Sequence, residues 1–177
     1  SSLENVTITA SIQSLNEHAF KGCTNLTHIN ITEGTTVISD SVFKNLTTLK
    51  TINIPRTITE ICNNSFENCT SLREITIPEN VTKIGHNAFK NCSSLQKITI
   101  STTVTEIGES SFENCTGLTE LIIPLNVTTI GMNAFKDCSS LENVTITASI
   151  QSLNEHSFNG CTNLTHINIT EGTTVIS

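Results

Sequence analysis

The chain has 177 residues, a net charge of −7, seven phenylalanines and neither Trp nor Tyr. Its acidic and basic residues are interspersed, so it lacks the basic stripe that a nucleic-acid-binding surface needs. No segment approaches the ~18 consecutive apolar residues of a membrane span, and no signal peptide is visible. We therefore expect no nucleic-acid partner and no membrane insertion by this segment.

The apolar residues follow one period of 23 residues. A leucine opens each unit and two β-branched or leucine positions follow at fixed offsets, as in Leu72, Ile75 and Ile77. A period of this size is the signature of a solenoid, in which each repeat forms one coil and stacking makes the core continuous. The sequence predicts one solenoid domain over residues 1–177, with seven complete repeats starting at Leu3 and a partial eighth. The phenylalanines that mark the period are Phe20, Phe43, Phe66, Phe89, Phe112, Phe135 and Phe158.

The first half of each coil is predicted to be extended. The L-x-x-I-x-I stretch ends in alternating β-branched residues, which predicts a strand that pairs in parallel with the same strand of adjacent coils. Pro55, Pro78 and Pro124 follow this stretch in three coils. Because Pro cannot donate to a ladder, we expect the strand to stop there. The later V-T-x-I stretch predicts a second, shorter extended piece.

The second half of each coil is predicted to turn the chain back. Gly85, Gly108 and Gly131 follow the V-T-x-I stretch and suggest a turn that requires positive φ. The next stretch, for example residues 86–92, is predicted to be a short helical turn that faces its Ala and Phe inward. The Asn, Asp or Gly before the Cys of the repeat fits a left-handed closing residue.

The full repeat reads L-x-x-I-x-I-(P/T)-x-x-V-T-x-I-G-x-x-(A/S)-F-x-x-C-x-x and is clearest from Leu72 to Cys138. This pattern resembles the BspA-like leucine-rich repeats, also called the Treponema pallidum type. Coil two departs most, because Leu46 replaces the Cys and residues 33–37 break the usual spacing of the second apolar pair. The resemblance covers the whole chain. It implies an α/β fold: a right-handed β/α superhelix with parallel strands on one face and short helical turns or loops on the other.

The same resemblance implies a role in adhesion or partner recognition, at the cell surface or after secretion, as in host–pathogen interaction. The partner would be a protein or glycan on a host or neighbouring cell. The implied mechanism is display of a surface by a rigid coil stack, without catalysis.

A longer repeat lies within the short one. Residues 1–39 reappear as residues 139–177 with two differences, Ala19 against Ser157 and Lys21 against Asn159. We therefore expect the chain to be a segment of a longer array. An alternative function follows, because uncapped coils expose unpaired strand edges that favour end-to-end association. In that alternative the chain is a self-assembling structural solenoid and a homo-oligomer through its terminal coils.

The cysteines form a second periodic line. Adjacent coils place their Cα atoms about 5 Å apart, inside the ~4.4–6.8 Å range of a disulfide. However, Leu46 occupies the same line and cannot form a bridge, and the total of seven is odd. We therefore interpret the line as small buried apolar residues. The six cysteines that share the position are Cys23, Cys69, Cys92, Cys115, Cys138 and Cys161.

No motif points to catalysis or to a bound group. The sequence lacks G-x-S-x-G, H-E-x-x-H, the Walker loop and G-x-G-x-x-G. It has no C-x-x-C pair, and a one-sided column of thiols cannot surround a zinc ion. We expect no enzyme, no cofactor and no metal site. Thirteen N-x-S/T sequons recur with the repeat, but Asn68, Asn91 and Asn114 abut the buried cysteines, where a glycan has little room.

The outward positions of the leading strand are the candidate binding surface, because the scaffold does not dictate them. Lys50, Arg73 and Lys97 are predicted to form a basic column in an acidic protein, and Ile122 is the lone apolar residue of its column. The alternative is a mixed, solvated strand face, since single exposed apolar residues are normal. The predicted partner-binding residues are Lys50, Asn53, Arg73, Glu74, Thr76, Lys97, Thr99, Glu120 and Ile122.

Overall fold

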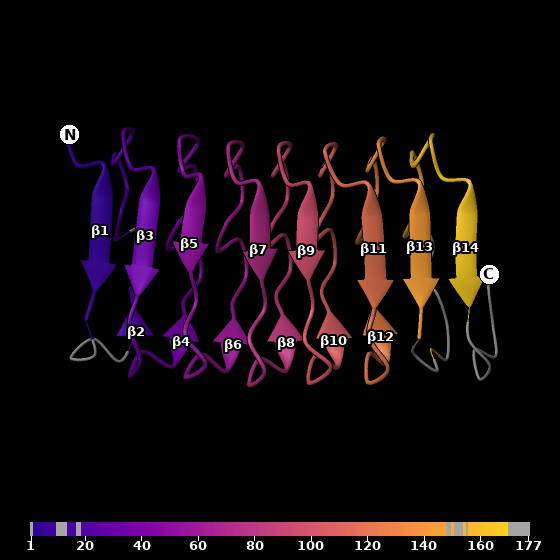
Figure 1. Cartoon of the computed structure of the whole chain (residues 1–177), viewed down its shortest axis with the longest axis horizontal. Helices are drawn as coiled ribbons and strands as arrows, with labels where there is room; N and C mark the ends of the chain where they lie inside the picture. Colours follow the sequence, from indigo (N-terminus) through magenta and orange to yellow (C-terminus); the bar gives the residue numbers. More distant parts are fainter. Residues whose placement is uncertain are drawn as a thin grey trace.

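The computed structural model describes residues 2–9, 14–16, 19–147, 150, 154 and 156–169. Within these residues the chain winds into a row of stacked coils (Figure 1). Each coil begins with a leading strand of three or four residues, and six of the coils add a short strand of two residues. The partial eighth repeat runs into residues 170–177, which lie outside the described residues.

Two sets of parallel strands build the coils. The leading strands are β1 (Asn5–Ile8), β3 (His28–Ile31), β5 (Thr51–Asn53), β7 (Glu74–Thr76), β9 (Lys97–Thr99), β11 (Glu120–Ile123), β13 (Asn143–Ile146) and β14 (His166–Ile169). The short strands are β2 (Ser14–Leu15), β4 (Val37–Ile38), β6 (Glu60–Ile61), β8 (Lys83–Ile84), β10 (Glu106–Ile107) and β12 (Thr129–Ile130). Paired residues are offset by 23 positions, for example Glu74 and Lys97, which confirms the predicted parallel solenoid.

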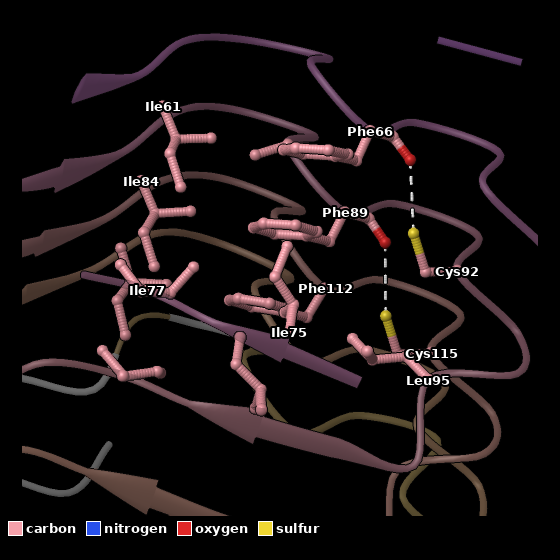
Figure 2. Close-up of a cluster of buried hydrophobic side chains, with 14 of the residues drawn as sticks. Ile61, Phe66, Ile75, Ile77, Ile84, Phe89, Cys92, Leu95, Phe112 and Cys115 are labelled. Atoms are coloured by element: carbon pink, nitrogen blue, oxygen red, sulfur yellow. Dashed lines mark hydrogen bonds between the residues drawn. The ribbon is translucent and has the colours of Figure 1, made fainter. Parts of the chain in front are cut away.

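The interior of the stack is a continuous apolar core. The phenylalanine rings of adjacent coils stack, with centroids 5.0 Å apart for Phe66 and Phe89 and 5.2 Å for Phe89 and Phe112. Figure 2 shows these three rings in a column beside the inward isoleucines. From Phe66 to Phe158 the planes of adjacent rings lie within 1–8° of parallel. Each coil alone is too small to bury such a ring, so burial depends on the neighbouring coils.

The cysteine line lies within this core as predicted. Cys69, Cys92, Cys115 and Cys138 are fully buried, and all seven cysteines are free thiols. The thiol of Cys92 donates to the carbonyl oxygen of Phe66 at 3.2 Å, and the thiol of Cys115 donates to that of Phe89 at 3.2 Å (Figure 2). Burial raises the pKa of Cys92 to about 12. These thiols therefore hold successive coils together as neutral donors.

The predicted helical turn is wrong, because no helix forms in the described residues. Asn87 and Asn91 have φ of 53° and 61°, and left-handed residues four apart interrupt a right-handed helix. Alternate N–H groups of the segment leave the coil: Asn87 and Phe89 donate to carbonyls of the next coil at 2.9 and 2.7 Å. Lys90 instead donates to Asn87 within the same coil at 3.1 Å. Residues 86–92 thus form a series of tight turns bonded to the neighbouring coil. We call this stretch, and its equivalents in the other coils, the turn segment. None of the described residues forms a helix that could cross a membrane.

The glycines after the short strands are required for a different reason from the one predicted. Gly85, Gly108 and Gly131 do not have positive φ. A Cβ on Gly108 would lie 2.6 Å from the carbonyl carbon of Gly85 and 2.7 Å from the nitrogen of His86. The glycines of adjacent coils therefore allow close backbone contact.

The second coil keeps its register despite the irregular sequence of residues 33–37. Thr35 is fully buried at the place where the other coils put the first residue of the second apolar pair. Val37 then pairs with Glu60, and Ile38 pairs with Ile61, in the same register as the other coils.

Candidate partner-binding face

The leading strands form one surface, which we call the leading face. All nine predicted binding residues are exposed on this face. Lys97 and Thr99 lie on β9, whereas Glu120 and Ile122 lie on β11. Ile122 has 62 % of its surface exposed, which is high for an isoleucine in a strand.

The predicted basic column is wrong in one member. Lys50 and Arg73 occupy the same repeat position, just before β5 and β7. Lys97 lies one position further along its coil, opposite Glu74 of β7. The leading face therefore places Lys97 in a column with acidic neighbours, where opposite charges on adjacent strands stabilise the pairing.

The three predicted cations of the leading face lie outside the ion pairs of the described residues. Among the described residues, no ion pair involves Lys50, Arg73 or Lys97. The four ion pairs that join described residues are Lys44–Glu67, Lys83–Glu106, Lys90–Glu113 and Lys136–Asp137, and they lie on short strands and turn segments.

The polar side chains of the leading face differ from those beside the short strands. Beside the short strands, Thr59 and Thr105 each donate a hydroxyl to the carbonyl of the preceding coil at 3.2 Å. On the leading face, the hydroxyls of Thr76 and Thr99 make no hydrogen bond to any described residue. The short strands thus use their threonines to join coils, whereas the leading face leaves these two available.

The sheet of leading strands is open in two places. Its ladders join β1, β3 and β5, then β7 and β9, then β11, β13 and β14, whereas the six short strands form a single sheet. Figure 1 shows the wider separations between β5 and β7 and between β9 and β11. Between β11 and β13, the N–H groups of Glu142 and Asn143 both donate to Thr119 at 2.9 and 3.4 Å. The equivalent donors Thr119 and Glu120 make no such bond to β9.

Both openings precede a strand that ends in proline. Where threonine occupies this position, its N–H donates to the preceding coil, as Thr32 does to Ile8 at 2.8 Å and Thr147 does to Ile123 at 3.0 Å. Pro78 after β7 and Pro124 after β11 cannot make this bond, because proline has no N–H. The missing bond accompanies both openings but is not sufficient for one, because the N–H of Ser101 makes no bond to Ile77 and β7 still pairs with β9.

The third proline is compensated by a neighbouring side chain. Pro55 follows β5, yet β3 and β5 remain paired. Here the Nδ2 of Asn53 donates to the Oδ1 of Asn30 at 3.0 Å and to the carbonyl of Ile31 at 3.4 Å. That carbonyl is the acceptor a residue with an N–H at position 55 would use. Asn53 is therefore a candidate site residue that also maintains the sheet.

Each opening is hollowed into a groove. The groove between β9 and β11, which we call the β9/β11 groove, has a volume of about 430 Å³. Its lining residues are Gln96, Lys97, Ile98, Thr99, Ile100, Thr119, Glu120 and Ile122. The groove between β5 and β7, the β5/β7 groove, has a volume of about 330 Å³ and is lined by Asn53, Glu74 and Thr76 among others. Seven of the nine predicted residues thus line a groove, and only Lys50 and Arg73 line neither.

The sequence did not reveal the apolar floor of these grooves. Ile98 and Ile100 point inward but retain 9 % and 8 % exposure, because the open ladder uncovers them. Ile75 and Ile77 of the preceding coil retain only 3 % and 2 %. The sequence signal for each groove was the proline that follows the second of its two strands, Pro78 or Pro124. From the sequence alone we interpret these prolines as the ends of their own strands and do not consider the bond to the preceding coil that they cannot make.

The described residues contain no group of three or more His, Cys, Asp or Glu side chains that could hold a metal ion. The fold and this face define a leucine-rich-repeat solenoid: a repeated scaffold that displays a variable surface. The match to the family model of BspA-type leucine-rich repeat regions spans residues 1–115 and 82–177 with six copies. The chain belongs to this family.

Solved structures of bacterial repeat proteins share the fold. A leucine-rich cell surface protein from Faecalibacterium prausnitzii is 24 % identical with a TM-score of 0.65, over 97 % of this chain and 61 % of that one. The leucine-rich repeat protein of T. pallidum is 24 % identical with a TM-score of 0.77, over 93 % of this chain and 73 % of that one. The pneumococcal vaccine antigen PcpA is 20 % identical with a TM-score of 0.64, over 98 % and 59 %. The chain therefore spans about three fifths of the first and third of these proteins. A comparison with curated proteins finds no match.

Proposed function

We propose that the chain is a non-catalytic binding module that presents its leading face to a macromolecule at a cell surface. The observation that carries this proposal is the unequal use of side chains. Among the described residues, Lys50, Arg73 and Lys97 make no ion pair and the hydroxyls of Thr76 and Thr99 make no hydrogen bond, whereas cations and threonines of the short strands and turn segments bond neighbouring coils. A scaffold that does not need these residues leaves them to specify a partner.

The surface setting is supported by the relatives. The Faecalibacterium protein is described as a cell surface protein and the pneumococcal protein as a vaccine antigen. The partner we propose is a protein or glycan on a host or neighbouring cell. Lys50, Arg73 and Lys97 provide the attractive charges toward an acidic patch on that partner.

The test is reversal of the three free cations. The triple variant Lys50→Glu, Arg73→Glu, Lys97→Glu is assayed with wild type on arrays of immobilised glycans and extracellular-matrix proteins, at several salt concentrations. We expect at least tenfold weaker binding and a smaller salt dependence, because each lost contact removes a screened attraction.

The matched control is Lys44→Glu, Lys83→Glu, Lys136→Glu, which changes net charge equally but alters cations away from the leading face. Binding that survives in the control and fails in the first variant supports the leading face. Equal loss in both, with the two variants shown by circular dichroism to be as folded as wild type, would assign the effect to net charge and overturn the proposal.

A further inference from the structure

We propose that the β9/β11 groove binds a short extended peptide of a protein partner, with an apolar peptide side chain against Ile122. This inference rests on the proposed binding function and names the class of partner. It starts from the groove itself, whose floor is Ile98 and Ile100 and whose wall is the 62 % exposed Ile122. Two hollows over the closed ladder of β1, β3 and β5 have similar volumes of about 440 Å³, so the open ladder and the exposed isoleucines, and not the volume, distinguish the β9/β11 groove.

The main-chain groups of the groove favour a peptide. In a parallel ladder, alternate residues direct both N–H and C=O toward the same neighbour. In β9, the residues next to Ile98 direct these groups toward β7, so Ile98 directs its own toward β11. In β11, the residues next to Ile122 direct theirs toward β13, so Ile122 directs its own toward β9. No ladder joins β9 to β11, so these groups have no strand partner there. An extended peptide that lies over the opening supplies donors and acceptors for these groups without becoming a strand of the sheet.

The rest of the coil limits how the peptide enters. Behind the groove the same two coils remain closed, because β10 pairs with β12 and the rings of Phe112 and Phe135 lie 5.3 Å apart. A whole strand therefore cannot insert between the coils. The peptide lies along the opening, bonds to one edge and places one side chain on the isoleucine floor.

The side chains around the groove argue for a peptide in preference to a glycan. The aromatic rings of the chain are all phenylalanines, and they stack inside the coils. The leading face thus offers no aromatic platform for a sugar ring. It offers an aliphatic side chain instead, flanked by Lys97 on β9 and Glu120 on β11. A peptide with an apolar residue beside charged or polar ones matches this arrangement.

The test begins with selection of a random heptapeptide phage library on the wild-type chain. Enriched peptides are synthesised with a terminal Trp, and their fluorescence reports binding without background because the chain has neither Trp nor Tyr. Two variants remove the groove. Pro124→Thr introduces the residue found at the same position in Thr32 and Thr147, and we expect it to restore the terminal bond and to close the ladder. Ile122→Thr introduces the residue found in Thr76 and Thr99.

Two matched controls preserve the groove. Leu125→Thr removes an apolar side chain that is also 62 % exposed but lies outside the groove. Pro78→Thr repairs the β5/β7 opening and leaves the β9/β11 opening unchanged. We expect Pro124→Thr and Ile122→Thr to weaken the peptide Kd at least tenfold, and both controls to change it less than twofold. Methylation of alternate peptide nitrogens should weaken binding similarly, because it removes main-chain donors.

Amide chemical shifts locate the bound peptide and separate the two proposals. Shifts at residues 96–100 and 119–122 are expected. Peptides that shift Lys50 and Arg73 and bind Pro124→Thr unchanged would overturn the groove inference while leaving the leading face as the binding surface. Shifts confined to the turn segments would contradict both. Failure to enrich any peptide would overturn the groove inference alone, because the array assay of the leading face does not depend on peptides.

Discussion

The short strands and the leading strands share one repeat but differ in continuity. The six short strands form one uninterrupted sheet, whereas the ladder of the leading strands opens between β5 and β7 and between β9 and β11. The coils remain stacked at both openings, because the phenylalanine rings behind them lie 5.0 and 5.3 Å apart. At these two openings, cohesion between coils therefore resides in the core, the short strands and the turn segment. The other adjacent leading strands remain paired.

The turn segment contributes its own inter-coil bonds. The side-chain amide of Asn68 donates to Asn45 at 2.7 Å, Asn91 donates to Asn68 at 2.8 Å, and Asn114 donates to Asn91 at 3.0 Å. Such a ladder satisfies each amide with its copy in the adjacent coil. It also occupies the nitrogen that a glycan would require, which agrees with the expectation that these sequons have little room for one. On the leading face, the described residues include one such bond between asparagine side chains, from Asn53 to Asn30.

The largest difference between the two regions should appear in core truncations. Phe89→Ala removes a fully buried ring with a stacked neighbour on each side, and we expect a loss of about 3–5 kcal/mol of unfolding free energy. Ile98→Ala, beside the β9/β11 groove, should cost about 2 kcal/mol, at the low end for such a change because its site is already open. Urea unfolding followed by far-UV circular dichroism measures both.

Phe20→Ala serves as the control for position in the stack. Phe20 is only partly buried, so its loss should be smaller than that of Phe89. Equal losses for Phe89 and Ile98 would show that the leading strands contribute as much to cohesion as the ring stack does, and would remove the distinction between the two regions.

The next largest effect should come from the glycines. Gly108→Ala places a methyl group 2.6 Å from the backbone of the adjacent coil, so two coils must separate there. We expect a loss of about 3 kcal/mol, at the upper end for overpacking. Gly22→Ala is the control: nothing lies within 4 Å of its Cβ, and only the φ of +83° opposes it, at a cost of about 1 kcal/mol. If Gly22→Ala costs as much as Gly108→Ala, backbone conformation and not contact between coils is the constraint.

These glycines also show which features a single sequence can reveal. Periodicity predicted the solenoid, the inward residues and the cysteine line, because burial repeats with the chain. It could not tell positive φ from close approach at Gly108, since glycine serves both. It wrongly predicted a helical turn at residues 86–92. The left-handed residues that prevent a helix there depend on bonds to the next coil, which the period does not reveal. It also placed Lys97 in the wrong column, since a shift of one residue along a strand changes its neighbours.

A smaller effect is expected from the asparagine ladder. Asn91→Gly keeps the left-handed conformation, with φ of 61° in the wild type, but removes two side-chain hydrogen bonds. We expect a loss of about 2 kcal/mol, near 1 kcal/mol for each bond. Asn133→Gly is the matched control, because Asn133 has a similar φ of 57° and its side chain bonds to no described residue. Thermal unfolding that shifts equally in both variants would mean that the ladder adds nothing beyond the backbone conformation.

The smallest effect concerns an ion pair of the turn segment, and it depends on pH. Glu113 accepts from the Nζ of Lys90 at 2.9 Å, and its side chain is only 13 % exposed. Burial raises the pKa of Glu113, but hydrogen bonds from Lys90 and Ser110 and the charges of Lys90 and Lys136 outweigh it, so the pKa lies below the ordinary value of 4.5. A lowered pKa in the folded state means that the stabilisation is complete above about pH 4.5 and is lost as the pH falls through the lowered value.

We therefore expect Glu113→Gln to be less stable than wild type at pH 7, by a few tenths of a kcal/mol, and the difference to shrink as the pH falls through the lowered pKa of Glu113. Glu106→Gln breaks the Lys83–Glu106 pair of the short strands, in which both side chains are 38–39 % exposed. It should have a smaller effect at pH 7, because solvent screens that pair. Unfolding midpoints measured at intervals between pH 7 and pH 3 compare the two variants. A difference for Glu113→Gln that does not shrink at all between pH 7 and pH 3 would argue that the carboxylate charge is not its source. In that case bonds between turn segments, like those of the asparagine ladder, join the coils without help from charge.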